Sequence, residues 1–284
     1  MQLTDQYNRK INYLRISVTD RCDLRCVYCM NEKMTFLPKK EILTLEEIER
    51  LCDNFIELGV KKIRLTGGEP LVRRDVIKLI NKLNSKKNKT NLKEITLTTN
   101  GTLLEKYARD LKKGGVNRIN VSLDTINHDK YKEITKFGNL DKVILGINEA
   151  KKNNIEIKIN TVVLKNFNED ELVELIYWTN KLDIDITFIE VMPMADTDTD
   201  RFFQFSPLNK IYDKLDINFN FIKTNKNTGG PATYYTSQKL SNKVGFITPL
   251  TNNFCANCNR VRISSTGKLY MCLGQNDYVD FREI

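Results

Sequence analysis

The 284-residue chain contains one histidine and one tryptophan, and it has no run of about 18 apolar residues. The missing run excludes a membrane-spanning helix, which needs about 20 mostly apolar residues. The start of the chain, Met1-Gln-Leu-Thr-Asp-Gln6, lacks the basic and apolar segments of a secretion signal. We therefore expect a cytoplasmic protein without a membrane partner, whose cysteines stay reduced and serve as metal ligands.

The composition is that of a basic globular protein. Hydrophobic residues make up 40% and charged residues 29% of the chain, and 45 Lys+Arg against 36 Asp+Glu give a net charge of +9. Such a charge suits an anionic partner, but Lys/Asn-rich stretches such as Asn84–Lys93 are typical of solvated surface. We expect no nucleic-acid partner, because the chain shows neither aromatic-studded basic surfaces nor a recognisable RNA module.

Short β-branched runs alternate with longer helical stretches over residues 12–192, which predicts an α/β fold with parallel strands and helical crossovers. The strands are largely apolar, as expected for burial on both faces. They are expected at Tyr13–Val18, Lys62–Thr66, Glu94–Thr99, Arg118–Leu123, Ile155–Leu164 and Asp185–Val191. Helices are expected after the capping box Thr44–Glu47, up to Gly59, and at about 73–85, 103–113, 140–153 and 168–181.

Six strand–helix units are compatible with part of a barrel or with an open doubly wound sheet. Either fold puts its site at the carboxyl ends of the strands. Five of the strand ends are polar, and together they outline an active site: Thr19–Cys22, Thr66–Pro70, Thr98–Gly101, Ser122–Asp124, and Glu190 with Met192.

After Met194 the alternation stops, and the segments Asp196–Asp200 and Thr228–Pro231 carry loop signals. Short strands are expected at Ala232–Gln238, Val244–Pro249 and Arg260–Cys272. We therefore predict two domains, residues 1–194 and a smaller β-containing region, residues 195–284, laid against the first.

Six of the seven cysteines form two triplets, C-x3-C-x2-C at Cys22, Cys26 and Cys29, and C-x2-C-x13-C at Cys255, Cys258 and Cys272. The seventh, Cys52, lies on an apolar helix stripe and is expected in the core. Structural zinc prefers four closed ligands, usually Cys with His, whereas His128 lies in a polar loop far from either triplet. Three thiolates on a [4Fe–4S] cluster would leave one iron open for a cofactor or substrate.

The second triplet is followed by a predicted hairpin. Arg260–Ser264 and Lys268–Cys272 flank the turn Ser265–Gly267, which would bring Cys272 back beside Cys258. Strand alternation puts Arg260 and Arg262 on one face, where two guanidinium groups would form a phosphate clamp.

The first triplet, with Tyr28 before its last cysteine, resembles the signature of radical S-adenosylmethionine enzymes, and Thr66–Pro70 resembles their glycine motif. The resemblance implies a partial (βα)6 TIM-type barrel. The run Phe254–Arg262 with Cys272, and the run Ile63–Pro70, closely resemble the MoaA family of GTP 3′,8-cyclases in molybdenum cofactor biosynthesis. This likeness extends from Tyr13 to about Gly274.

The resemblance implies two [4Fe–4S] clusters, S-adenosylmethionine (SAM) as cofactor and GTP as substrate. Cys22, Cys26 and Cys29 would hold the cluster that binds SAM, and Cys255, Cys258 and Cys272 the cluster that contacts guanine. The SAM pocket would be lined by Tyr28, Gly68, Ser122 and Met192. The nucleotide would be held by Arg15, Arg64, Thr98, Lys158, Arg260 and Arg262, and Lys158 must then point into the barrel. On physical grounds the glycines let the backbone approach the cofactor, and Glu69 is suited to pair with its ammonium group.

In the family, a 5′-deoxyadenosyl radical takes hydrogen from the ribose C3′ of GTP, and the carbon radical attacks C8. Reduction, assisted by Arg260 and Arg262 as catalytic residues, then gives 3′,8-cyclo-7,8-dihydro-GTP. The resemblance implies an electron donor and a downstream enzyme resembling MoaC as partners, and it leaves a homodimer open. Family members usually continue to a Gly-Gly tail, so a chain ending at Val279–Ile284 is expected to be a fragment or a short variant.

Three other functions are weighed against this one. A peptide-modifying radical maturase usually has more C-terminal cysteines, and Asn259–Arg262 favours the cyclase. A zinc-stabilised RNA-binding protein would contain zinc instead of iron and sulfide. Simple electron transfer leaves the glycine motif and the polar strand ends unexplained.

Overall fold

The computed structural model describes residues 3–5, 8–192, 201–252, 254–272 and 277–283. Within them one 12-stranded sheet has the order β12-β11-β10-β1-β2-β3-β4-β5-β6-β9-β8-β7. Its strands are β1 Tyr13–Ser17, β2 Lys62–Thr66, β3 Glu94–Thr99, β4 Arg118–Ser122, β5 Glu156–Val163, β6 Asp185–Glu190, β7 Ile222–Lys223, β8 Thr233–Thr236, β9 Val244–Ile247, β10 Arg260–Ile263, β11 Lys268–Tyr270 and β12 Tyr278–Asp280.

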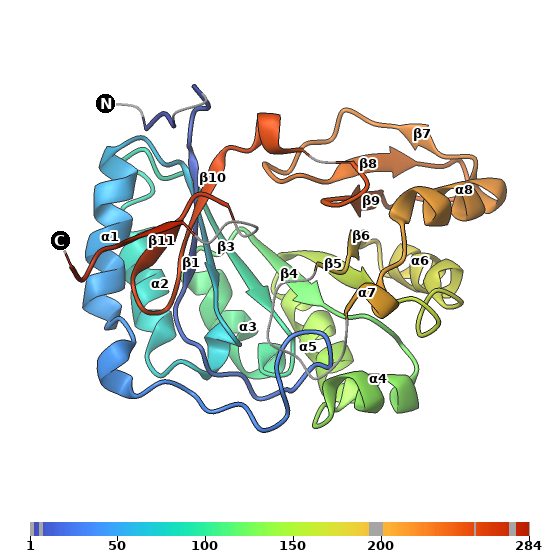
Figure 1. Cartoon of the computed structure of the whole chain (residues 1–284), viewed down its shortest axis with the longest axis horizontal. Helices are drawn as coiled ribbons and strands as arrows, with labels where there is room; N and C mark the ends of the chain where they lie inside the picture. Colours follow the sequence, from blue (N-terminus) through green and yellow to red (C-terminus); the bar gives the residue numbers. More distant parts are fainter. Residues whose placement is uncertain (1–2, 6–7, 193–200, 253, 273–276, 284) are drawn as a thin grey trace.

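The central strands, from β10 through β1–β6 to β9, all pair in parallel, and antiparallel strands extend both edges. Among the described residues, the edge strands β12 and β7 do not pair with each other, so the sheet is open, and the helices flank its outer side (Figure 1). An α/β fold of the partial-barrel type is confirmed. The helices are α1 Leu45–Glu57, α2 Val76–Asn84, α3 Leu104–Lys113, α4 His128–Thr135, α5 Leu140–Lys152, α6 Leu172–Lys181, α7 Arg201–Gln204 and α8 Leu208–Phe219.

Helix α1 shows why these elements form where the sequence predicts them. Thr44 Oγ1 accepts a hydrogen bond from Glu47 N at 3.1 Å, and Thr44 N donates to Glu47 Oε2 at 2.6 Å. This capping box satisfies two backbone donors that the first turn leaves without partners. Gly59, at φ 96°, follows the helix in the left-handed region that favours glycine. Cys52 is fully buried in the core, as predicted.

The two faces of the sheet differ sharply in chemistry. Apolar side chains such as Leu14, Ile63 and Ile119 are fully buried in the core. Alternation turns the intervening residues to the inner face, where buried Arg64 and Lys158 are found. The expectation of apolar residues on both faces is therefore wrong for the inner face, because that face surrounds a polar interior.

The C-terminal region joins the main sheet instead of only lying against it. Strands β10–β12 extend the sheet beyond β1, and β7–β9 extend it beyond β6. The expected domain boundary at residue 194 lies outside the described residues. Over the described ranges, no helix is long and apolar enough to cross a membrane.

The polar loop expected around His128 is wrong, because His128 is the first residue of helix α4. Asn127 caps that helix by accepting hydrogen bonds from Asp129 N at 3.0 Å and Lys130 N at 3.1 Å. His128 Nε2 lies 3.0 Å from Asp141 Oδ1, so the imidazole contacts the neighbouring helix.

Candidate active site

The first cysteine triplet lies on the loop that follows β1, at the carboxyl end of the strands. Cys29 N donates to Cys26 O at 2.8 Å, which closes a turn between these two residues. Val27 N donates to Ile134 O at 2.9 Å and so ties the loop to helix α4. Cys22 Sγ accepts a hydrogen bond from Leu24 N at 3.4 Å. A backbone donor of this kind stabilises a thiolate.

The glycine motif packs against the same loop. A Cβ atom on Gly68 would lie 2.3 Å from Arg21 O, and one on Gly67 would lie 2.6 Å from Thr19 O. Gly68 N also donates to Thr19 O at 2.9 Å. These contacts give the two glycines a role that the sequence did not predict. Because glycine has no side chain, the backbones of the two loops can pack directly against each other.

Glu69 is almost fully buried and joins the ends of β2 and β3. Its Oε1 accepts from Leu71 N at 2.9 Å and from Thr99 Oγ1 at 2.8 Å, and its Oε2 accepts from Asn100 N at 2.7 Å. Burial nevertheless raises the pKa of this carboxyl to about 7. A bound ammonium group would favour the charged form that burial disfavours.

The residues expected to line the SAM pocket all lie at this end of the sheet. Ser122 ends β4, while Gly68 and Met192 follow the ends of β2 and β6. Tyr28 Oη donates to Asp124 Oδ2 at 2.6 Å, which places the tyrosine over the end of β4. Burial raises the pKa of Asp124 to about 6.

The second triplet lies at the opposite end of β1. Arg260 begins β10 and is in register with Tyr13, the first residue of β1. Cys258 N donates to Cys255 O at 3.1 Å, so this C-x2-C pair closes the same kind of turn as Cys26 and Cys29. Strands β10 and β11 form the predicted hairpin, with Arg262 opposite Tyr270 and Cys272 two residues further on. The two triplets therefore lie at opposite ends of the paired strands β1 and β10.

Three guanidinium-bearing residues occupy one row between the triplets. Arg15 is in register with Arg262 on one side and with Arg64 on the other. Arg64 Nη1 donates to Thr98 Oγ1 at 3.2 Å. Together with Arg260, these arginines have no ion pair with a carboxylate within the described residues. Four buried or half-buried cations without acidic partners form a site for a polyanion.

The electrostatics of this row reflect burial and mutual repulsion. Burial and the charges of Arg15 and Arg260 lower the pKa of Arg262 to about 9. Burial is also the main cause of the lowered pKa of Arg15. Burial alone would raise the pKa of Tyr13, but nearby cations, Arg64 first, outweigh it and lower that pKa. A bound polyphosphate would relieve this repulsion.

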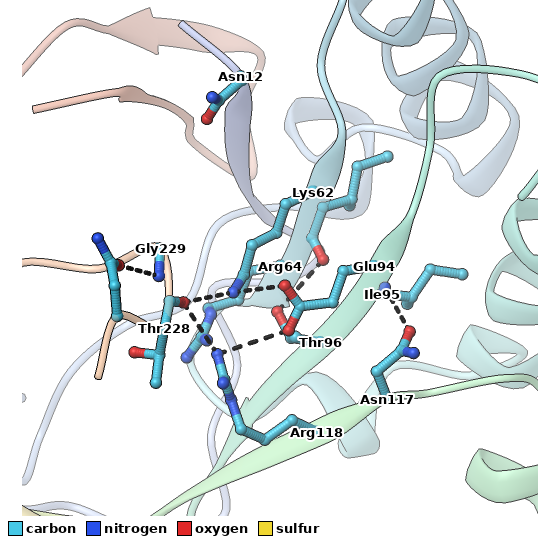
Figure 2. Close-up of polar contacts among 12 residues, drawn as sticks. Asn12, Lys62, Arg64, Glu94, Ile95, Thr96, Asn117, Arg118, Thr228 and Gly229 are labelled. Atoms are coloured by element: carbon cyan, nitrogen blue, oxygen red, sulfur yellow. Dashed lines mark hydrogen bonds and ion pairs between the residues drawn. The ribbon is translucent and has the colours of Figure 1, made fainter. Parts of the chain in front are cut away.

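Sequence reasoning missed a group of charged residues at the amino end of the strands (Figure 2). Lys62 Nζ lies 2.7 Å from Glu94 Oε2 and donates to Thr228 O at 2.8 Å. Arg118 Nη2 lies 3.5 Å from Glu94 Oε1 and 3.2 Å from Thr228 O. The loop at Thr228 therefore closes this end of the interior. Polar residues at every second position of the strands were the signal that could have identified Lys62 and Arg118.

Lys158 points into the interior, as its expected role requires. Its Nζ donates to Tyr234 Oη at 3.0 Å, and Tyr234 comes from β8 in the C-terminal region. Burial, followed by the charges of Arg64 and Arg118, lowers the pKa of Lys158 well below its ordinary value.

Several polar atoms of the inner face are buried and have no hydrogen-bond partner among the residues that the structure describes. Buried polar groups in folded proteins are normally paired, so a cluster of unpaired ones indicates a place for a polar ligand. The unpaired atoms on the inner face are Arg15 Nε, Arg64 Nε, Arg118 Nε, Arg262 Nε, Asn120 Oδ1, Asn160 Oδ1 and Thr187 Oγ1.

The two thiol sets fit iron–sulfur clusters in their donor chemistry, because each offers three thiols around a closed turn. Within the described ranges, no group of three Cys, His, Asp or Glu side chains is arranged to hold a single metal ion. Burial raises the pKa of Cys22 to about 12 and that of Cys26 well above its ordinary value. Loading iron there would release protons, since the ligands are thiolates.

The fold is that of radical SAM enzymes. SuiB of Streptococcus suis, solved with S-adenosylmethionine, superimposes with a TM-score of 0.69 at 18% identity, covering 98% of this chain and 65% of SuiB. The chain thus spans about two thirds of SuiB. Native anSMEcpe with bound AdoMet gives a TM-score of 0.61 at 19% identity, covering 95% of this chain and 79% of that one. The sequence profile of the Radical SAM superfamily matches residues 16–178.

The particular family follows from closer relatives. The Molybdenum Cofactor Synthesis C profile matches residues 184–284. The GTP 3′,8-cyclase of Bradyrhizobium diazoefficiens is 53% identical over 281 residues, covering 99% of this chain and 82% of the relative. The GTP 3′,8-cyclase of Brucella ovis is 52% identical over 281 residues, again covering 99% of this chain and 82% of the relative. The chain belongs to the GTP 3′,8-cyclase family of radical SAM enzymes.

Proposed function

We propose that this protein is a radical SAM GTP 3′,8-cyclase, which converts GTP to 3′,8-cyclo-7,8-dihydro-GTP in the first step of molybdenum cofactor biosynthesis. One observation carries the proposal beyond family membership. Arg15, Arg64 and Arg262, which have no acidic partner among the described residues, line an interior that has one thiol triplet at each end of β1. That arrangement suits an anionic nucleotide held between two clusters.

At the carboxyl end, Cys22, Cys26 and Cys29 would hold the first [4Fe–4S] cluster. Tyr28, Gly68, Ser122 and Met192 would orient SAM beside it. When bound, the cluster and SAM supply a 5′-deoxyadenosyl radical. Tyr28 is held by its hydrogen bond to Asp124, and Gly68 by its backbone hydrogen bond to Thr19 O, so the chain contributes a rigid frame at this end.

At the amino end, Cys255, Cys258 and Cys272 would hold a second [4Fe–4S] cluster with an iron left open for guanine. The remaining contacts to GTP would come from Arg15, Arg64, Thr98, Lys158, Arg260 and Arg262. Arg260 and Arg262 stand on the strand that follows Cys258, so they would stabilise charge that develops near the guanine and act as catalytic residues.

Asn120 extends this set beyond what the sequence indicated. It is in register with Thr98 on β3 and with Lys158 on β5, and it is 3% exposed. Its unpaired Oδ1 would accept a hydrogen bond from a hydroxyl or amino group of the nucleotide.

Cellular partners follow from the proposed reaction. Radical formation needs an electron donor, and the cyclic product needs a rearranging enzyme resembling MoaC. We place the protein in the cytoplasm, where thiols remain reduced. We also keep the division into residues 1–194 and 195–284, which the two profile matches, 16–178 and 184–284, support.

The test is release of 5′-deoxyadenosine by anaerobically reconstituted protein given SAM and dithionite. The proposal expects release that GTP stimulates and ATP does not. Release indifferent to GTP would keep the radical class and remove GTP as the substrate. Protein that binds zinc alone and releases nothing would overturn the proposal as a whole.

A further inference from the structure

The N-terminal arm, residues 3–5 and 8–12, lies beside the second thiol triplet. Asn12 N donates to Asn259 O at 3.1 Å, and Asn259 Nδ2 donates to Asn12 Oδ1 at 2.8 Å. Leu3 N donates to Leu58 O at 3.0 Å and so fixes the other end of the arm at the C-terminal end of helix α1. The arm is therefore anchored at Leu3 and at Asn12.

Arg9 is held in one orientation by Asp5. Asp5 Oδ1 accepts from Arg9 N at 2.9 Å, and Asp5 Oδ2 accepts from Arg9 Nε at 2.6 Å and pairs with Nη2 at 2.5 Å. The Asp5 side chain is only 2% exposed. Asn8, at φ 60°, also donates from its N to Asp5 O at 3.0 Å. Two charge-assisted contacts, from Arg9 Nε and Nη2, converge on the same oxygen, Asp5 Oδ2, and hold the guanidinium in place.

The remaining terminal nitrogen of that guanidinium contacts the second triplet. Arg9 Nη1 donates to Cys255 O at 2.5 Å, across 246 positions of sequence. The same carbonyl oxygen accepts from Cys258 N at 3.1 Å and closes the C-x2-C turn. Arg9 therefore binds the atom that sets the spacing between Cys255 and Cys258.

We infer that Arg9, oriented by Asp5, is a positioning residue for the second cluster, which it serves by fixing the Cys255–Cys258 turn and by placing a positive charge beside it. The inference rests on the proposed function, because the second cluster is part of that proposal. Net charge near an iron–sulfur cluster helps to set its reduction potential. Loss of the Arg9 charge therefore shifts the potential of the second cluster to more negative values, and loss of the hydrogen bond makes its iron more labile.

The test uses the full chain with Cys22, Cys26 and Cys29 changed to Ser, so that only the second triplet can assemble a cluster. Arg9→Gln, Arg9→Lys and the control Lys10→Gln are made in this parent and reconstituted anaerobically with iron and sulfide. Lys10 is exposed on the same arm and has the same charge as Arg9. Iron loss to a chelator, the electron paramagnetic resonance spectrum and the midpoint potential are measured for each.

Arg9→Gln is expected to lose iron several-fold faster than Lys10→Gln and to have a more negative potential. Arg9→Lys keeps the positive charge but not the guanidinium contacts to Asp5 and Cys255. Its midpoint potential is therefore expected to stay near that of the parent, and its rate of iron loss to lie between those of the parent and Arg9→Gln. Equal iron loss and equal potential in Arg9→Gln and Lys10→Gln overturn the inference. If Arg9→Gln does not fold, Arg9→Lys is the test variant instead. In that case the inference is overturned if Arg9→Lys loses iron at the same rate as Lys10→Gln. A parent that assembles no cluster is a distinct failure, since it removes the second cluster from the proposed function and the inference with it.

Discussion

Arg15 and Arg262 stand in register on the neighbouring parallel strands β1 and β10, although they come from opposite ends of the chain. Neither forms an ion pair with a carboxylate of the described residues. Two such cations side by side repel each other, and burial strengthens the repulsion. Their coexistence is explained most simply by an anionic substrate that lies between them.

Arg15→Gln is expected to weaken GTP binding about ten- to a hundredfold, because a hydrogen bond to a charged group contributes about 1.5–3 kcal/mol. Equilibrium dialysis of GTP against the reconstituted protein measures this under anaerobic conditions. Arg74→Gln is the matched control, since its side chain is 95% exposed. Equal affinities in the two variants would contradict the assignment of Arg15 to the nucleotide site.

Glu94→Gln is expected to destabilise the protein by about 2 kcal/mol. The change leaves the buried cations Lys62 and Arg118 without their shared carboxylate, and the Glu94 side chain is 30% exposed, so the loss is smaller than for a fully buried pair. Urea denaturation measures the free energy of unfolding. Glu156→Gln, at a 57% exposed partner of Arg118, should change it by less than about 0.5 kcal/mol. Similar losses of unfolding free energy in both variants would contradict the role of Glu94 as the shared partner of Lys62 and Arg118.

Gly68→Ala is expected to abolish SAM-dependent cleavage, because the new Cβ atom would meet Arg21 O at 2.3 Å and force the two loops apart. Gly230→Ala is the control, since its Cβ atom would meet only Thr228 Oγ1, at 3.9 Å. Release of 5′-deoxyadenosine and iron content are measured for both. Normal cleavage by Gly68→Ala would show that the close approach at Gly68 is not needed.

Glu69 is expected to make the metal-free protein less stable as the pH rises. Its pKa is about 7 in the folded protein against an ordinary 4.5, so the folded state keeps a proton that the unfolded chain releases. The free energy of unfolding therefore falls between about pH 4.5 and pH 7, by about 3 kcal/mol from this group. Glu69→Gln should have a clearly shallower slope, with only the part due to Asp124 remaining, whereas exposed Glu57→Gln should keep the full slope. Denaturation at pH 5, 6, 7 and 8 compares them, and an unchanged slope in Glu69→Gln would contradict the prediction.

The sequence predicted the six central strands to within about a residue and the capped helix α1, because each depends on local pattern alone. Helix α4 was missed, since the run His128–Thr135 has only eight residues and only two large apolar ones, Tyr131 and Ile134, which are too few for a periodic stripe. The contact between Arg9 and Cys255 joins distant parts of the chain, so no local pattern indicates it. Strand alternation could have placed Lys62 and Arg118 on the inner face, but only register across the strands shows that both reach the carboxylate of Glu94.

The most direct test of the account is transfer of the hydrogen at C3′ of GTP. Reconstituted protein is given SAM, dithionite and GTP carrying deuterium at C3′, and the products are analysed by mass spectrometry. The account predicts one deuterium in 5′-deoxyadenosine and a cyclic nucleotide that has lost it. Unlabelled 5′-deoxyadenosine, formed while the deuterium remains in GTP, would contradict it.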